Sequence, residues 1–199
     1  AAHADNNSVA EAPGLAGLLL YRIDEPQLNT CSIYEPCVAL IVQGRKRILL
    51  GDETLDCDPG RCLITSLDLP ANSEVIAASV RKPCVGLVLK LDIRLLAELI
   101  AQEPEAPPRE RSLQGSVGVG GVTSALLEPI ARLLALLDEP AAIPVLAPLI
   151  QREIHYRLLA GEAGARLRQI ATVDTQSHQV ARAIAQLNAR FAEPLRIEA

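Results

Sequence analysis

The stretch that decides the fold is IPVLAPLIQREIHYRLLAG, residues 143–161. The spacing of its aliphatic residues predicts a helix with one wide apolar stripe, made by Leu146, Leu149, Ile150, Ile154, Leu158 and Leu159. Pro144 and Pro148 are tolerated where the helix begins, since a first turn leaves its N–H groups unpaired. Gly161 is expected to end the helix. Glu153 and Arg157 have the spacing of a helical ion pair.

The residues before this helix predict a series of short strands. Apolar or alternating runs, separated by turn residues, cover residues 18–23, 38–43, 46–50, 54–57, 62–66, 73–80 and 84–91. Gly44-Arg45 is expected to turn a hairpin, and Asp68-Leu69-Pro70 is expected to break a strand. Because no helix separates these strands, the pattern favours an antiparallel barrel or a sandwich.

From Asp92 onward the hydrophobic period changes from two to 3.6. Asp92 is a good N-cap for a helix that ends before Pro104. Residues 102–121, rich in Pro, Gly and Ser, predict a loop, and residues 123–137 predict the helix that precedes the central one. The apolar face of a last helix, residues 180–191, needs partners, so we expect this chain to be part of a longer protein. Strands followed by helices predict an α+β fold.

Composition excludes several classes of function. The chain has 199 residues, 49% hydrophobic but only 2% aromatic, and a formal net charge of -5. Few aromatic rings argue against stacking on bases, and a negative charge argues against gripping nucleic acid with these residues alone. The first 14 residues lack the pattern of a signal peptide and predict a flexible arm. We therefore expect a cytoplasmic protein without a membrane partner.

Metal or nucleophilic catalysis is not expected. The three histidines, His3, His155 and His178, lie in the arm or on helices, whereas a metal-binding barrel of this size places histidines on its strands. No nucleophile elbow and no phosphate loop is present. We therefore predict no metal, no cofactor and no enzyme activity, and His155 is expected to lie on a helix surface or half-buried.

Two further features have alternative interpretations. Five cysteines, an odd number without a C-x-x-C pair, indicate reduced thiols that pack as small apolar groups. A redox sensor is the alternative, and it would need an exposed thiol beside a positive charge. The basic run Arg45-Lys46-Arg47 is expected to be a solvated strand edge, with an anion site as the alternative.

The chain closely resembles AraC-type bacterial transcription regulators, in the branch that carries the AraC-type N-terminal domain. The resemblance rests on four stretches in order: YEPCVALIVQGRKRILLGDETLDCDPGRCLITSLDLP (34–70), IPVLAPLIQREIHYRLLAG (143–161), LRQIA (167–171) and AIAQLNARFAEPLRIEA (183–199). It covers residues 34–199. The family's sugar-binding members use aromatic pocket residues, which this chain largely lacks, so no ligand contact is carried over from them.

The resemblance implies four segments. Residues 1–14 would be the arm, 15–91 a cupin-like antiparallel β-barrel (a double-stranded β-helix), and 92–172 a helical region that packs on the barrel and mediates dimers. Residues 173–199 would hold the first helix and the start of the second of a helix-turn-helix DNA-binding domain. The recognition helices would be missing, so operator DNA is expected as a partner of the full-length protein only.

An effector pocket in such a barrel would be lined by Cys, Val, Leu and Ile. Tyr34, Gln43, Thr65 and Ser66 are our candidates for orienting a small, mostly apolar effector. Each could instead be an ordinary strand or turn residue.

A homodimer is also expected. Leu126, Leu133 and Leu137, with the stripe of residues 143–161, would be divided between the core and a dimer seam. Two alternatives to an effector-sensing and dimerisation domain remain: a dimerisation or protein-interaction module without a ligand, and a metal-free cupin enzyme.

Overall fold

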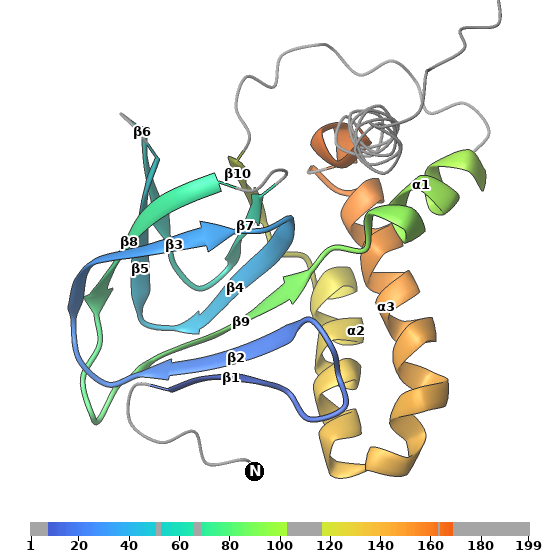
Figure 1. Cartoon of the computed structure of the whole chain (residues 1–199), viewed down its shortest axis with the longest axis horizontal. Helices are drawn as coiled ribbons and strands as arrows, with labels where there is room; N and C mark the ends of the chain where they lie inside the picture. Colours follow the sequence, from blue (N-terminus) through green and yellow to red (C-terminus); the bar gives the residue numbers. More distant parts are fainter. Residues whose placement is uncertain (1–7, 51–52, 66–68, 103–116, 163, 169–199) are drawn as a thin grey trace, which may run out of the picture.

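The computed structural model describes residues 8–50, 53–65, 69–102, 117–162 and 164–168. In this part of the chain, two antiparallel sheets lie face to face and a layer of helices covers one of them (Figure 1). The predicted α+β class is confirmed. The predicted closed barrel is not formed, because no described strand of one sheet pairs with a strand of the other.

The larger sheet has six strands, and the smaller one has four. In spatial order the larger contains β1 (Ser8–Glu11), β2 (Leu18–Ile23), β9 (Cys84–Lys90), β4 (Cys37–Gln43), β7 (Arg61–Thr65) and β10 (Val117–Gly121). The smaller contains β3 (Gln27–Tyr34), β8 (Leu69–Ala77), β5 (Arg45–Leu50) and β6 (Glu53–Cys57). The helical elements are α1 (Ile93–Gln102), α2 (Ser124–Ala135), η1 (Leu136–Asp138), η2 (Pro140–Ala142) and α3 (Ile143–Ala160).

Gly44 marks a corner between the two sheets, so the predicted hairpin there is wrong. β4 pairs with β7 and β9, whereas β5 pairs with β6 and β8. Gly44 has φ +88°, and a Cβ on it would lie 2.7 Å from the carbonyl oxygen of Ala77. Only glycine allows the chain to pass so close to the neighbouring backbone. β7 ends at Thr65 and a separate strand in the other sheet, β8, begins at Leu69, so the strand ends before the predicted break residues, although Pro70 itself lies in β8 opposite Ile33.

Three strands were not predicted. β1 lies within the predicted arm, β10 lies within the predicted loop 102–121, and β3 has a largely polar sequence. β10 contains three glycines and is held by its five-residue pairing with β7. Pairing with a preformed neighbour supplies the backbone hydrogen bonds that local propensity does not favour. Residues 173–199, for which the first helix and the start of the second helix of a DNA-binding domain are predicted, lie outside the described residues.

Both faces of the six-stranded sheet are buried. One face packs against the helices through a cluster rich in leucine, which includes Leu18, Leu89 and Leu133. The other faces the four-stranded sheet through a second cluster, which includes Tyr21 and Ile48. The aliphatic composition predicted this kind of core.

The buried face of α3 is rotated from the predicted stripe. Ile150, Ile154, Leu158 and Leu159 are buried as expected, but Leu146 and Leu149 are 41% and 63% exposed. Instead, Ile143 and Ala147 complete the inward face at helical spacing. Arg157 and Glu153 form the predicted pair, at 3.5 Å. The helix therefore has a second, outward apolar face.

His155 joins α3 to the start of α1, and the prediction of a surface or half-buried ring is wrong. Its side chain is 2% exposed. Nε2 accepts a hydrogen bond from the backbone N–H of Asp92 at 2.9 Å, and Nδ1 lies 2.7 Å from the carbonyl oxygen of Gln151. The Asp92 carboxylate caps α1, as predicted, by accepting from the N–H groups of Arg94 and Leu95. The junction of sheet and helices is thus held by one neutral imidazole.

The first prediction concerns this junction. His155→Leu is expected to lower the free energy of unfolding by about 1–3 kcal/mol, because it removes both hydrogen bonds of a buried ring. Chemical denaturation measures the change. Val80→Ala, at a position that is 70% exposed in a turn away from α3, is the control and should stay within about 0.5 kcal/mol of the wild type.

His155→Leu should also change how the stability of the protein depends on pH. Burial lowers the pKa of His155 below its ordinary 6.5, against smaller raising effects of Gln151 and Asp92. The unfolded chain therefore binds the proton more readily, so stability is lost as the pH falls below about 6.5. His155→Leu should lose this component. An equal loss of stability on acidification in both proteins would contradict the assigned role.

Candidate functional site

The predicted pocket residues do not form one open site. The Thr65 hydroxyl is buried, donates to the carbonyl oxygen of Glu35 at 2.7 Å and accepts from the N–H of Cys37 at 3.1 Å. Gln43 Nε2 donates to the carbonyl oxygen of Pro83 at 2.8 Å. These two side chains hold the backbone of strand ends and turns. Ser66 lies outside the described residues.

Tyr34 belongs to a different cluster, between the two sheets. The Nζ of Lys46 lies 5.6 Å from the ring centroid of Tyr21 and 5.8 Å from that of Tyr34. Cation–π contacts of this length stabilise a partly buried ammonium. Tyr21 and two cysteines, Cys57 and Cys84, are buried in the same inter-sheet cluster. The space between the sheets therefore contains one cation among aromatic rings and thiols.

The buried thiols are poor nucleophiles at neutral pH. Desolvation raises the pKa of Cys57 to about 11, against a smaller lowering effect of Lys46. Burial likewise raises the pKa of Cys37, Cys62 and Cys84. The structure thus favours the interpretation of these four as packing groups. Cys31 is exposed.

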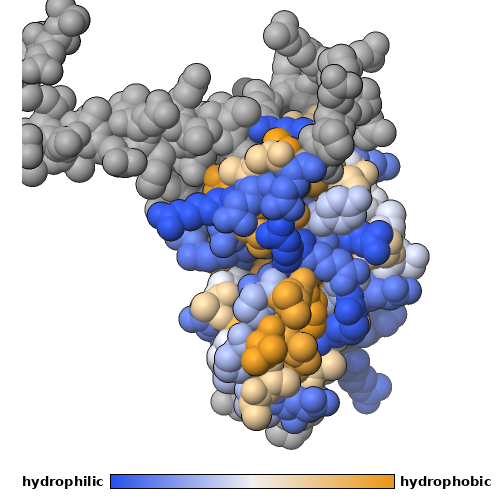
Figure 2. All heavy atoms as spheres, turned by 90° about the vertical axis from the view of Figure 1, so that its right-hand side faces the viewer, coloured by the Kyte–Doolittle hydropathy of each residue, from blue (hydrophilic) through white to orange (hydrophobic). Residues whose placement is uncertain are grey.

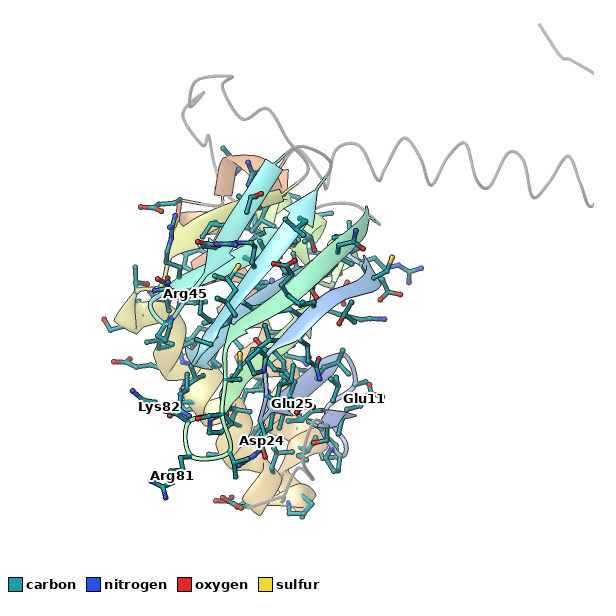
Figure 3. The ribbon with its side chains drawn as sticks, turned by 90° about the vertical axis from the view of Figure 1, so that its left-hand side faces the viewer. Glu11, Asp24, Glu25, Arg45, Arg81 and Lys82 are labelled. Atoms are coloured by element: carbon teal, nitrogen blue, oxygen red, sulfur yellow. The ribbon has the colours of Figure 1, made fainter. Side chains whose placement is uncertain are left out.

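The run Arg45-Lys46-Arg47 does not form a single anion site. Arg47 pairs with Asp56 across β5 and β6 at 2.7 Å, while Lys46 lies over the two tyrosine rings. Arg45 stays exposed near the turn that carries Arg81 and Lys82, on the flank opposite Glu11 (Figure 3). Alternation along a strand separates these charges.

A cavity of about 410 Å³ opens at another place, between β7, β10, α2 and the end of α3. Its apolar wall is made by Ile64, Leu126 and Leu158, and its polar groups include Arg157 and Glu162. Of the predicted pocket residues that the structure describes, Tyr34, Gln43 and Thr65 do not line it. The missed signal is the run VGVGG of β10, whose last two glycines, Gly120 and Gly121, line the cavity without side chains to fill it.

The predicted dimer seam lies largely in the core. Leu126 and Leu133 are buried, Leu133 with 1% exposure, and Leu137 is half-buried. Leu133→Arg would therefore report on folding rather than on association. Apolar side chains are exposed instead on α3, where Val145 and Leu149 are 67% and 63% exposed. An apolar patch is visible on the helical side of the molecule (Figure 2). The signal was present in the sequence, because residues 143–150 are apolar on more than one face.

No metal-binding group was found in the described residues, where no three His, Cys, Asp or Glu side chains cluster suitably. In the same ranges, no single helix is long and apolar enough to cross a membrane. Residues Ser124–Asp138 and Pro140–Ala160 pass that test only as a pair, and they are bent by 118°.

The second prediction concerns the thiols. A thiol reagent such as DTNB should label Cys31 rapidly in the native protein and the other four cysteines only after unfolding, because burial holds them protonated and inaccessible. Absorbance measures the number of fast thiols. Cys31→Ser should abolish the fast phase; several fast thiols in the wild type would revive the redox-sensor interpretation.

Comparison with known proteins gives one decisive match. Residues 14–166 match the model of the family described as AraC-type transcriptional regulator N-terminus. No curated protein matches the chain.

Three solved structures illustrate the structural likeness. ToxT from Vibrio cholerae O395 is 9% identical, with a TM-score of 0.47 over 76% of this chain and 54% of that one. The AraC-like transcriptional activator CuxR is 17% identical, with a TM-score of 0.42 over 74% and 52%. A cupin superfamily protein from Desulfitobacterium hafniense DCB-2 is 17% identical, with a TM-score of 0.30 over 38% and 66%.

The chain thus spans about half the length of the two regulators. The family match covers well over half of this chain and includes the described strands β2 to β10 and the helices α1, α2 and α3. The chain belongs to the family of AraC-type transcriptional regulator N-terminal domains.

Proposed function

We propose that this chain is the effector-sensing and dimerisation part of a DNA-binding transcription regulator that acts in the cytoplasm and is not an enzyme. The family match over residues 14–166 carries the proposal. Residues 173–199 would begin the DNA-binding domain, after the arm at 1–14, the strand region at 15–91 and the helical region at 92–172. The two sheets would be the halves of a cupin-like barrel. Operator DNA would be bound by the full-length protein.

The outer face of α3 supports a homodimer. Val145, Leu149 and Tyr156 are 67%, 63% and 45% exposed, and their spacing of four and seven places them on one side of the helix. Figure 2 displays an apolar patch flanked by polar surface on this side of the molecule. Apolar patches rimmed by polar groups mark interaction sites. A two-fold dimer would bury this face against its own copy.

Polar contacts with α1 and α2 hold α3 in place and so make such a seam rigid. Arg152 Nη2 donates to Gln102 Oε1 at 2.9 Å, which ties α3 to α1, and Glu153 pairs with Arg132 of α2. Polar contacts thus anchor α3 on both sides, while the apolar residues between them stay exposed. A preorganised face loses less entropy when it binds a partner.

We also propose that the effector is contacted by Tyr34, Gln43, Thr65 and Ser66. The hydrogen bonds of Thr65 and Gln43 favour a supporting role for these two. Tyr34 is half-buried beside Lys46, so it is the member best placed to meet a ligand between the sheets. A module that only dimerises is the second candidate, and the exposed face of α3 favours it equally.

The third prediction tests the seam. Leu149→Arg should raise the dissociation constant of the homodimer at least about tenfold, or 1.4 kcal/mol, because the interface would bury an unpaired charge. Sedimentation velocity over a concentration series measures it. Val80→Arg is the matched control, since Val80 is 70% exposed in a turn of the strand region. A dimer unchanged by Leu149→Arg, with both variants folded, would refute the seam on α3.

A further inference from the structure

The cavity beside β10 lies where the six-stranded sheet, α2 and α3 meet. Ile64 belongs to β7, Leu126 to α2 and Leu158 to the last turn of α3, and all three line it. A molecule held here would contact all three elements at once. At about 410 Å³ it is at the small end of ligand sites.

Glycine keeps this cavity open. A Cβ built on Gly120 would have Glu162 Oε2 at 3.7 Å and Cys62 Sγ at 3.8 Å as its nearest neighbours. These are ordinary van der Waals distances, so a side chain at this position is not sterically forbidden. The structure therefore leaves empty a space that a small side chain could occupy, although close packing is the rule in protein interiors.

Among the described residues that line the cavity, Arg157 carries a positive charge. Its ion-pair partner, Glu153 Oε1, lies at a long 3.5 Å and belongs to a carboxylate that also pairs with Arg132. The carboxylate of Glu162 is engaged, because its Oε2 accepts a hydrogen bond from the N–H of Gly121 at 3.1 Å. A guanidinium can bind a carboxylate with two parallel hydrogen bonds.

A second polar group in the cavity lining favours an anion. Thr123, the N-cap of α2, also lines the cavity, and its side chain makes no capping hydrogen bond. Its hydroxyl is therefore available to a ligand. The N-terminal end of a helix adds a partial positive charge.

We propose that this cavity binds a small aliphatic monocarboxylate, with the carboxylate on Arg157 and the aliphatic body against Ile64, Leu126 and Leu158. No aromatic residue is among the described lining residues, which favours an aliphatic body over a ring that stacks. The site is distinct from the inter-sheet cluster of Tyr34 and Lys46. The site specifies a ligand class for the proposed sensing role. Binding in the cavity does not depend on that role, whereas its use in regulation does.

The fourth prediction uses an isosteric pair of probes, cyclohexanecarboxylate and its neutral amide, in isothermal titration calorimetry with the whole chain. The acid should bind saturably and at least about tenfold more tightly than the amide, because only the acid pairs with Arg157. Arg157→Gln should remove most of that preference. Arg152→Gln, on the same helix but outside the cavity lining, is the control and should leave it unchanged.

Filling the cavity tests its location. Gly120→Val should weaken acid and amide alike by at least about tenfold, since its methyl groups occupy the space of the aliphatic body. Gly120→Ala, which adds a single methyl at ordinary contact distance, replaces it if the valine variant does not fold by circular dichroism. Undiminished binding in the filled variant would overturn the proposal and direct the ligand to the space between the sheets.

The remaining outcomes are equally decisive. Equal affinities for acid and amide, equal effects of Arg157→Gln and Arg152→Gln, or no saturable binding of either probe would each refute the site. Sedimentation velocity on the same samples reports association separately. Loss of the dimer with binding retained would refute the proposed seam and leave the cavity site standing.

Discussion

The hydrogen bond between the backbone N–H of Asp92 and Nε2 of His155 is the constraint on which the arrangement of the helices depends. Asp92 lies between β9, which is paired on both sides in the larger sheet, and the first turn of α1. The ring that accepts from it comes from the middle of α3, 63 residues later in the chain. A buried neutral imidazole therefore links α3 directly to the junction between the sheet and α1. Because the ring is buried, it serves this role in its uncharged form.

This constraint explains why α3 has two apolar faces. Because His155 and Ile154 point inward, helical geometry directs Leu149 outward. A rotation of α3 that buried Leu149 would break the hydrogen bond between His155 and Asp92. The inward face completes the leucine-rich core against the sheet, while the outward face is available for a second copy. The cavity follows from the same arrangement, since the end of α3 passes over a strand whose glycines do not fill the gap.

Hydrophobic periodicity predicted the features that local sequence controls. The Asp92 cap, the helix from Ile143 to Ala160 and most strands were predicted because each depends on residues close in the sequence. It could not predict which face of α3 is buried, since Leu149 and Ile150 are equally apolar and only the contact of His155 decides. Nor could it predict that Gly44 turns a corner rather than a hairpin, because the pairing partners are distant. The resemblance identified the family, whereas the candidate pocket residues remain untested and the cavity beside Gly120 was not anticipated.

Hydroxyl-radical footprinting of the chain at increasing protein concentration tests the α3 seam most directly. With a seam on α3, oxidation of Leu149 and Tyr156 falls as dimers form, while Leu28, which is 78% exposed on β3, keeps its rate. Protection of the α3 residues alone would place the seam where the structure exposes apolar surface. Oxidation of Leu149 that stays constant through the concentration range of association, with protection at Leu28 instead, would contradict the central claim.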